Sequence, residues 1–322
     1  MSPNTSASDK KRGAARRRSA PTWPGRPGSG RAAKRDRPWL LPLVLLFGLG
    51  AAILWAALAR PAEDPAEARR TRLQTLVEGY LGDQPGVHGV AISDLDGQHP
   101  VLVNAQRTFA AGSQFKLLIL YRVYQRVAAG QLSLEAPLTI GVEDAVEGEP
   151  PAGLAPGQTV SVRQACESLI TVSSNAAAYA LARTVGGWEQ VRSVPGELGL
   201  GHTRFDDYWW TTPADLLRFY QLLATGRLVN PSVSQEMYGL LASQTRNDRL
   251  PSLLPAGVSV AHKTGEIGDA RNDAGVVNGP AARYIIVLMS QDPEPERAIE
   301  AQARLSRLVY DFYASPPGSD SP

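Results

Sequence analysis

Three short motifs in this chain combine hydroxyl, amine and amide side chains that could together carry out acyl transfer. They are an S-x-x-K motif at residues 113–116, an S-x-N motif at residues 173–175 and a K-T-G motif at residues 263–265, with first residues 60 and 90 positions apart. A serine hydroxyl becomes a strong nucleophile when a nearby base takes its proton, and a lysine whose pKa is lowered by burial can be that base. Ser113 is therefore the candidate nucleophile and Lys116 the candidate base, although an S-x-x-K motif alone is expected by chance in a chain of this length.

The first motif opens a segment, residues 113–129, that carries apolar side chains on nearly all sides. A helix of this kind is typical of the centre of a domain, and Gly112 before it and Gly130 after it are suitable boundaries. Ser113 is then at the helix N-terminus, where free backbone N–H groups and the helix dipole favour a developing negative charge. Lys116 follows on the same face one turn later. Taken singly, Ser113 would be an ordinary helix cap and Lys116 a surface amine.

The second motif lies between two predicted helices. Ser161 and Gln164 form a capping-box pattern at the start of the first helix. Its apolar side chains recur at helical spacing, at Val162, Ala165, Cys166, Leu169 and Ile170. A second helix is predicted to begin near Asn175, so the short loop between them can present Ser173 and Asn175 to a cleft. An ordinary Ser/Asn helix junction would explain the same residues. Cys166, the single cysteine of the chain, is expected to be a small core side chain.

The third motif lies on a predicted strand, because residues 258–264 alternate between apolar and polar side chains. A strand edge beside the nucleophile can supply a backbone N–H group to an oxyanion, and Gly265 allows a ligand to approach closely. His262 precedes Lys263, but neighbouring strand residues point to opposite faces, which argues against a Ser–His pair.

Together the three motifs resemble those of the serine β-lactamases and penicillin-binding proteins, with the class A β-lactamases the most similar group. The resemblance extends over about 250 residues. It implies that Ser173 relays a proton to the leaving nitrogen, and that Asn175 holds the substrate amide and contacts Lys116. It also implies an oxyanion hole formed by the backbone N–H groups of Ser113 and Glu266.

The same resemblance assigns the remaining substrate contacts. Lys263 and Thr264 would bind a substrate carboxylate, beside Gly265. Arg271 lies in the same segment and would add positive charge there. Class A enzymes usually carry a small residue at the position of Glu266, and the sequence alone gives no reason for an acid beside an anionic substrate.

One departure from the class A pattern concerns hydrolysis of the acyl-enzyme. Class A enzymes hold a glutamate that activates the deacylating water in a long loop before a Thr-Thr-Pro segment. In this chain that loop is largely deleted, and no glutamate lies between Glu197 and Glu236. Asp206 or Asp207 could replace it, although capping of the helix at Pro213 is the favoured interpretation. We therefore expect slow hydrolysis of the acyl-enzyme.

The remaining pattern places strands at both ends of the folded part and helices between them. Strands are predicted at residues 90–95, 101–103, 258–264, 273–278 and 283–289. A first helix is predicted at residues 67–82, and a closing helix carries Ile299, Gln302, Leu305, Val309 and Phe312. This order indicates an α/β fold of the α+β type, with a mixed antiparallel sheet flanked by terminal helices. An all-helical lobe is expected against the sheet, with the active site between them.

Charge and hydropathy divide the chain into unequal parts. Residues 1–38 hold 11 Lys/Arg and 2 Asp, whereas the rest holds 22 Lys/Arg and 29 Asp/Glu. Residues 1–38 are predicted to be a disordered basic cytoplasmic tail. Residues 39–59 carry no charge and are long enough for a transmembrane helix, which the basic side places with its N-terminus in the cytoplasm. A linker at 60–66, a catalytic domain at 67–316 outside the cytoplasmic membrane and a disordered tail at 317–322 complete the division.

The competing interpretation of the apolar segment is a cleaved signal peptide. Residues 57–59 fit a cleavage site, but the basic region before the apolar segment is far longer than such peptides carry. We therefore expect an uncleaved single-pass anchor.

Other chemistries fit poorly. The chain has no G-x-S-x-G motif, and its four histidines lack metal-ligand spacing, so we expect no metal, no cofactor and no nucleic-acid partner. The sequence predicts a monomeric, membrane-anchored serine hydrolase whose Ser113 is acylated by a β-lactam or a D-alanyl-peptide, with slow β-lactam hydrolysis. The alternatives are a peptidoglycan D,D-peptidase and a non-catalytic cell-wall-binding relative.

Overall fold

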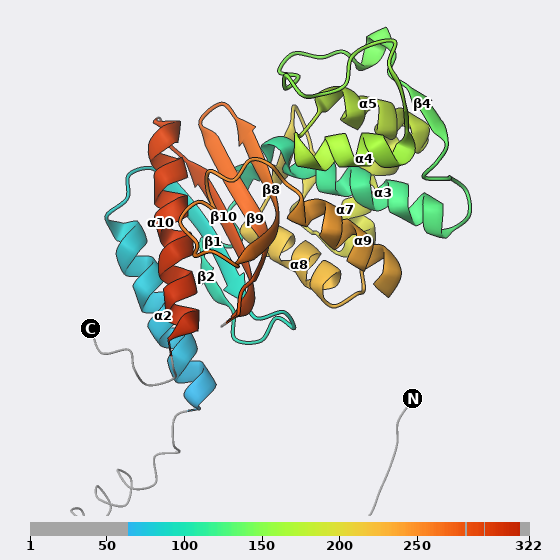
Figure 1. Ribbon diagram of the computed structural model, residues 1–322. Helices are drawn as coiled ribbons and strands as arrows, with labels where there is room; N and C mark the ends of the chain where they lie inside the picture. The colour runs from blue at the N-terminus through green and yellow to red at the C-terminus, as the bar shows by residue number, and fades with distance from the viewer. Residues whose placement is uncertain (1–63, 281, 293, 316–322) are drawn as a thin grey trace, which may run out of the picture. The chain divides into compact units, whose positions relative to one another are not determined.

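The computed structural model describes residues 64–280, 282–292 and 294–315, and its framework is a five-stranded sheet in the order β2-β1-β10-β9-β8 (Figure 1). All four neighbouring pairs are antiparallel. The strands are β1 (Val87–Ser93), β2 (Val101–Val103), β8 (Ser259–Ile267), β9 (Ala270–Asn278) and β10 (Arg283–Gln291). The two ends of the folded part meet where β1 pairs with β10, with Val90 opposite Leu288. The predicted antiparallel sheet of distant segments is confirmed.

Each face of the sheet has its own hydrophobic core, because successive strand residues point to opposite faces. On one face, Ile286 packs with apolar side chains of α2 (Pro65–Gly82) and α10 (Pro295–Ala314), which lie side by side (Figure 1). On the other face, Ile285 belongs to the core that contains α8 (Pro213–Ala224) and the helical lobe. The sheet is therefore covered by the predicted terminal helices on one side and joined to the helical lobe on the other.

The lobe contains six α-helices and two 3₁₀-helices among the residues that the structure describes. They are η1 (Gly112–Phe115), α3 (Lys116–Ala128), η2 (Val142–Asp144), α4 (Val162–Thr171), α5 (Asn175–Thr184), α6 (Trp188–Arg192), α7 (Val194–Leu198) and α9 (Pro231–Ala242). The prediction of an all-helical lobe was wrong in one respect, since β4 (Pro137–Thr139) pairs with β5 (Thr159–Ser161). A further small sheet joins β3 (Phe109–Ala110), β7 (Trp209–Thr211) and β6 (Arg204–Phe205). Strands of two or three residues are too short to show a period in the sequence.

Local side-chain caps fix where the two helices around the second motif begin. Ser161 Oγ accepts a hydrogen bond from Gln164 N at 3.1 Å, and Gln164 Oε1 accepts one from Ser161 N at 2.9 Å, which confirms the predicted capping box. Ser174 caps α5 by accepting a hydrogen bond from Ala177 N at 3.1 Å. Cys166 is fully buried in the core, as expected.

No helix within the described parts of the chain is long and apolar enough to cross a membrane. The predicted basic tail at 1–38, the predicted span at 39–59 and the tail at 317–322 lie outside the described residues.

Candidate active site

Ser113 lies in a tight turn at the entrance to the lobe. The predicted helix over residues 113–129 is present, but its first turn is the 3₁₀-helix η1, and α3 begins at Lys116. Side chains three residues apart are aligned in a 3₁₀-helix, so Lys116 follows Ser113 on the same side of this turn. Ser113 is partly exposed and lines a cleft, whereas Lys116 has no exposed surface.

The turn that carries Ser113 is held against strand β8. Gln114 Nε2 donates a hydrogen bond to the carbonyl oxygen of Lys263 at 2.6 Å, and Asn272 Nδ2 donates one to Ala110 O at 2.8 Å. The two backbones are also in close contact, which requires glycine on each side. A Cβ atom on Gly112 would lie 2.4 Å from the backbone nitrogen of Glu266, and one on Gly265 would lie 2.3 Å from Ala111 O. This contact brings the backbone nitrogen of Glu266 close to Gly112, the residue before Ser113, which is compatible with the predicted oxyanion hole.

A buried network of amines and oxygens connects the three motifs. Lys116 Nζ donates hydrogen bonds to Asn175 Oδ1 at 2.7 Å, to Ser173 Oγ at 3.0 Å and to the Ser173 carbonyl oxygen. Lys263 Nζ donates to the same Ser173 Oγ at 3.0 Å and to Thr264 O at 3.0 Å. Ser173 has a φ angle of 61°, a left-handed conformation that is costly for a non-glycine residue and is common at functional sites. The predicted contact between Asn175 and Lys116 is thus present, and Ser173 lies between the two lysines.

Burial makes both lysines weak bases. It lowers the pKa of Lys116 to about 7, where the negative charge of Glu149 acts to raise it and the positive charge of Arg246 to lower it further. Burial likewise lowers the pKa of Lys263 well below its ordinary value, and the neighbouring Lys116 adds to this shift. A lysine with a pKa near 7 can be neutral at physiological pH and can accept the proton of Ser113.

Glu149 is a functional candidate that the sequence analysis missed. Its Oε2 accepts hydrogen bonds from the backbone nitrogens of Asn175 at 2.6 Å and Ala176 at 2.7 Å. Its Oε1 accepts one from Ser174 Oγ at 2.5 Å and one from Leu154 N at 3.1 Å. The carboxylate therefore caps α5 from a loop that is distant in sequence, and the helix dipole favours its charge there. No local pattern links this loop to α5.

Glu266 has a structural role that the sequence did not reveal. Its carboxylate pairs with Arg246 at 2.7 Å and with Arg249, whose side chain is fully buried. Burial alone would raise the pKa of Glu266, but the hydrogen bonds from the two arginines outweigh it and lower the pKa to about 2. Glu266 thus compensates a buried guanidinium, which would be costly without an anionic partner.

Two of the predicted substrate contacts lie elsewhere than expected. Arg271 is not among the described residues that line the cleft, and its Nη1 donates hydrogen bonds to the carbonyl oxygens of Gly268 and Ala270 at 2.9 Å. Among the described residues, the arginines that do line the cleft are Arg192 and Arg246, which sequence reasoning missed. Lys263 is fully buried and is not among the described residues that line the cleft, whereas Thr264 of the same motif lines it.

His262 is engaged by residues other than Ser113. Its Nδ1 lies 2.8 Å from Asp273 Oδ1 and its Nε2 lies 3.1 Å from Asn247 Oδ1. Both ring nitrogens are therefore occupied, and His262 is not among the described residues that line the cleft.

The segment that takes the place of the class A loop is a hairpin formed by β6 and β7. Asp206 pairs with Arg204 at 2.8 Å on the surface. Asp207 lines the cleft, and its Oδ1 accepts hydrogen bonds from Tyr208 N at 3.0 Å and Trp210 Nε1 at 3.3 Å. The interpretation that these acids cap the helix at Pro213 was wrong. The α8 cap is Thr212, whose Oγ1 accepts a hydrogen bond from Asp215 N at 3.2 Å.

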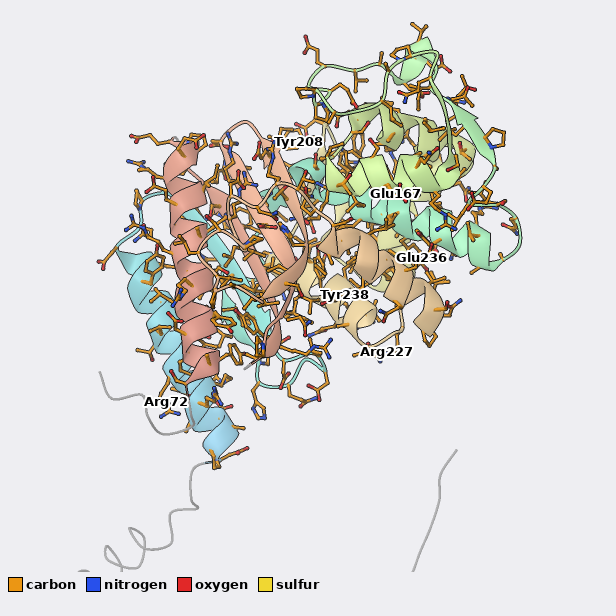
Figure 2. All side chains as sticks on the ribbon, in the orientation of Figure 1. Arg72, Glu167, Tyr208, Arg227, Glu236 and Tyr238 are labelled. Atoms are coloured by element: carbon orange, nitrogen blue, oxygen red, sulfur yellow. The ribbon has the colours of Figure 1, made fainter. Side chains whose placement is uncertain are left out.

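The resulting cleft has a volume of about 590 Å³ and lies between the lobe and the edge of the sheet. The lobe contributes Ser113, Ser173 and Asn175, and β8 contributes Thr264 and Glu266. Figure 2 labels Tyr208, which comes from the β6–β7 hairpin and lines this cleft. All three motifs therefore meet at one site.

The antiparallel sheet, the helical lobe and the three motifs at their junction define the fold of a β-lactamase-like serine hydrolase. A model described as "Beta-lactamase enzyme family" matches residues 68–313. The chain belongs to this family, which confirms the resemblance drawn from its motifs.

Solved structures show the same relationship. The structure of PBP-A is 27% identical, with 76% of this chain and 96% of that chain covered and a TM-score of 0.70. An ancestral class A β-lactamase (GNCA) is also 27% identical, with 74% and 99% covered and a TM-score of 0.68. A β-lactamase from Sphaerobacter thermophilus DSM 20745 is 22% identical, with 78% and 99% covered and a TM-score of 0.67, and shows the same fold.

Proposed function

We propose that this protein forms an acyl-enzyme on Ser113 with β-lactams or D-alanyl-peptides and hydrolyses it slowly. The observation that carries the proposal is the buried network in which Lys116 and Lys263 both donate hydrogen bonds to Ser173 Oγ. This network holds Lys116, a weak amine base, and Ser173, a hydroxyl group that can pass on a proton, close to the turn that carries Ser113. A non-catalytic cell-wall-binding relative would not need two lysines in this costly position.

Acylation follows from this geometry. Neutral Lys116 takes the proton of Ser113 as its Oγ forms a bond to the substrate carbonyl carbon. The N–H groups of Ser113 and Glu266 stabilise the oxyanion. The C–N bond then breaks, and the leaving nitrogen receives a proton from Ser173 Oγ, which is resupplied by protonated Lys116.

Slow deacylation follows from the hairpin. The hairpin carries two acidic residues, Asp206 and Asp207. Asp206 pairs with Arg204, and Asp207 accepts hydrogen bonds from Tyr208 and Trp210 within the hairpin. Neither carboxylate is held by the network around Ser113. Loss of a dedicated general base costs about 10²–10⁴-fold in rate. PBP-A supports this proposal, because one of its variants has been solved as an acyl-enzyme complex with penicillin G.

The test is intact-mass analysis after exposure to benzylpenicillin, followed by removal of excess drug. We expect one adduct on the peptide that contains Ser113, none in Ser113→Ala, and a lifetime of minutes or longer. An adduct that persists in Ser113→Ala would contradict the nucleophile assignment. Release within a second in wild type, lost in Asp206→Asn or Asp207→Asn, would show that a hairpin carboxylate activates the water.

A D,D-peptidase is the second candidate, and the absence of a glutamate in the hairpin favours it. Release of D-alanine from a D-alanyl-D-alanine peptide, lost in Ser113→Ala, would identify that activity. We also propose that the domain lies outside the cytoplasmic membrane as a single-pass, monomeric protein, on the basis of the sequence of residues 39–59 and its flanking charges.

A further inference from the structure

Five aromatic rings form a continuous row along the cleft, and the mechanism above uses none of them. Adjacent ring centroids are 5.1 Å apart for Tyr179 and Trp188, 6.1 Å for Trp188 and Phe115, 6.1 Å for Phe115 and Trp209, and 5.6 Å for Trp209 and Phe205. All five residues line the cleft. These distances are typical of interacting aromatic pairs. We call this row the aromatic arc.

The arc is assembled from five separate elements. Its rings come from α5, α6, η1, β7 and β6 in turn. The rings therefore meet only through the packing of these five elements against one another. The hairpin that takes the place of the class A loop supplies Trp209 and Phe205. The arc is therefore a feature of the folded site, and its end at Phe205 depends on this hairpin.

The ends of the arc are open to solvent. Tyr179 is 37% exposed and Phe205 is 39% exposed, whereas Trp209 in between is 5% exposed. The guanidinium of Arg192 lies 4.5 Å from the ring centroid of Phe205 and holds that ring at the rim. Exposed aromatic side chains gathered in a cleft are typical of ligand-binding surfaces.

The position of the arc indicates which part of a substrate it meets. In the mechanism proposed above, Ser173 gives its proton to the leaving nitrogen. Thr264 and Arg246 also line the cleft, and they are suited to bind a carboxylate of the leaving group. Phe115 belongs to the same 3₁₀ turn as Ser113, and the arc extends from it in both directions. The substituent on the acyl side of the scissile bond is thus the part that lies along the rings.

We propose that the aromatic arc is the binding site for the acyl group of the substrate, and that it selects acyl groups with an aromatic or extended apolar substituent. The proposal rests on the function proposed above and adds the class of substrate. Apolar acyl groups gain by leaving water and stacking on the rings, whereas a substrate without such a group gains only the polar contacts.

Two compounds with the same bicyclic nucleus and carboxylate test this. Benzylpenicillin carries a phenylacetyl group, and 6-aminopenicillanic acid carries a free amine in its place. We expect the second-order rate constant of acylation to be at least about tenfold higher for benzylpenicillin, since about 1.4 kcal/mol of added binding gives a tenfold change. Phe205→Ala and Trp188→Ala should each reduce this preference several-fold and leave the rate with 6-aminopenicillanic acid within about twofold.

Tyr238→Ala is the matched control. Tyr238 is an aromatic residue of α9 that is not among the described residues lining the cleft, so the preference should stay unchanged. Equal rates with both compounds in wild type, or an unchanged preference in Phe205→Ala and Trp188→Ala, would overturn the role of the arc and leave the nucleophile assignment intact.

A non-covalent measurement separates the two proposals. Calorimetric titration of Ser113→Ala with the same compounds should show binding at least about tenfold tighter for benzylpenicillin. If wild type forms no adduct with either compound, the proposed function is wrong. The titration of Ser113→Ala still tests whether the aromatic arc binds the acyl group. Equal affinity in Ser113→Ala would then overturn the arc as well.

Discussion

At the scale of single residues, the site holds two lysine amines that donate hydrogen bonds to one serine oxygen. When both amines are charged they repel each other, and this repulsion helps to lower the pKa of Lys263. Lys116 and Lys263 both donate to Ser173 Oγ, each from 3.0 Å away and each without exposed surface. Burial disfavours charge on both. The lower pKa values that result turn lysine, ordinarily an acid at neutral pH, into a base that can serve Ser113.

The pH dependence of acylation should report this directly. Lys116 acts when neutral, so the rate constant should rise with pH and level off above about 7. At pH 5, two units lower, it should be about a hundredfold below the plateau, because the neutral fraction falls tenfold per unit. Stopped-flow acylation between pH 5 and 9 measures this, with Lys116→Arg as a control that should stay slow throughout. A flat wild-type profile would contradict the assignment of Lys116 as the base.

Glu149→Gln tests the carboxylate at the start of α5. Its negative charge raises the pKa of Lys116, so removing it should move the midpoint of the acylation profile to lower pH. Loss of a charged helix cap should also lower the free energy of unfolding by about 1–2 kcal/mol. Urea unfolding and the acylation profile give the two readouts.

Glu147→Gln is the matched control for this prediction. Glu147 lines the same cleft two residues away but accepts the Asn175 Nδ2 hydrogen bond with its backbone oxygen, which the substitution keeps. Both readouts should stay near wild type. An unshifted midpoint in Glu149→Gln would show that the carboxylate only caps the helix.

At the scale of elements, the site depends on how closely η1 packs against β8. Side chains hold the two together through Gln114 and Asn272, and glycines allow the backbones to meet. The N–H groups of Ser113 and Glu266 belong to these two elements. Their separation is therefore fixed by packing between a turn and a strand that are distant in sequence.

Gly112→Ala should show the importance of this contact. Gly112 has a φ of +51°, and an added Cβ would lie 2.4 Å from the Glu266 nitrogen, so β8 must move away. Displacement of one oxyanion donor should slow acylation about a hundredfold. Gly130→Ala is the control, because Gly130 has a φ of +68° but open space around it. It should lose about 1 kcal/mol of stability and keep the wild-type rate of acylation, and equal rates in the two variants would contradict the prediction.

At the scale of the whole molecule, the sheet is closed by strands from both ends of the domain. β1 lies between β2 and β10, and β8 at the other edge borders the cleft. The K-T-G strand and the turn that carries Ser113 thus belong to parts of the domain that are distant in sequence and pack directly against each other.

The location of the domain is a prediction at the same scale. Protease added to intact cells should digest the domain after Arg60 and leave residues 1–38 protected, because the basic side of an apolar span stays in the cytoplasm. Immunoblotting with an antibody to each part measures this, with a cytoplasmic protein as the control for cell integrity. Mature protein that begins at Arg60 in the medium would show a cleaved signal peptide instead.

The sequence by itself determined the features that depend on neighbours along the chain. The capping box at Ser161, the start of α5 near Asn175 and the strands of the sheet all follow from caps and periods within a few residues. The three motifs were recognisable for the same reason, because each is a fixed local spacing. These local rules gave the fold class and the candidate nucleophile with its two neighbouring lysines.

Only the tertiary structure decided which distant side chains meet. Glu149 reaches α5 from a separate loop, Arg246 lines the cleft whereas Arg271 is not among the described lining residues, and Glu266 compensates the buried Arg249. The aromatic arc likewise joins rings from five elements. Such contacts depend on how helices and strands pack in three dimensions. The spacing of residues along the chain does not determine that packing, so these contacts could not be predicted from local patterns.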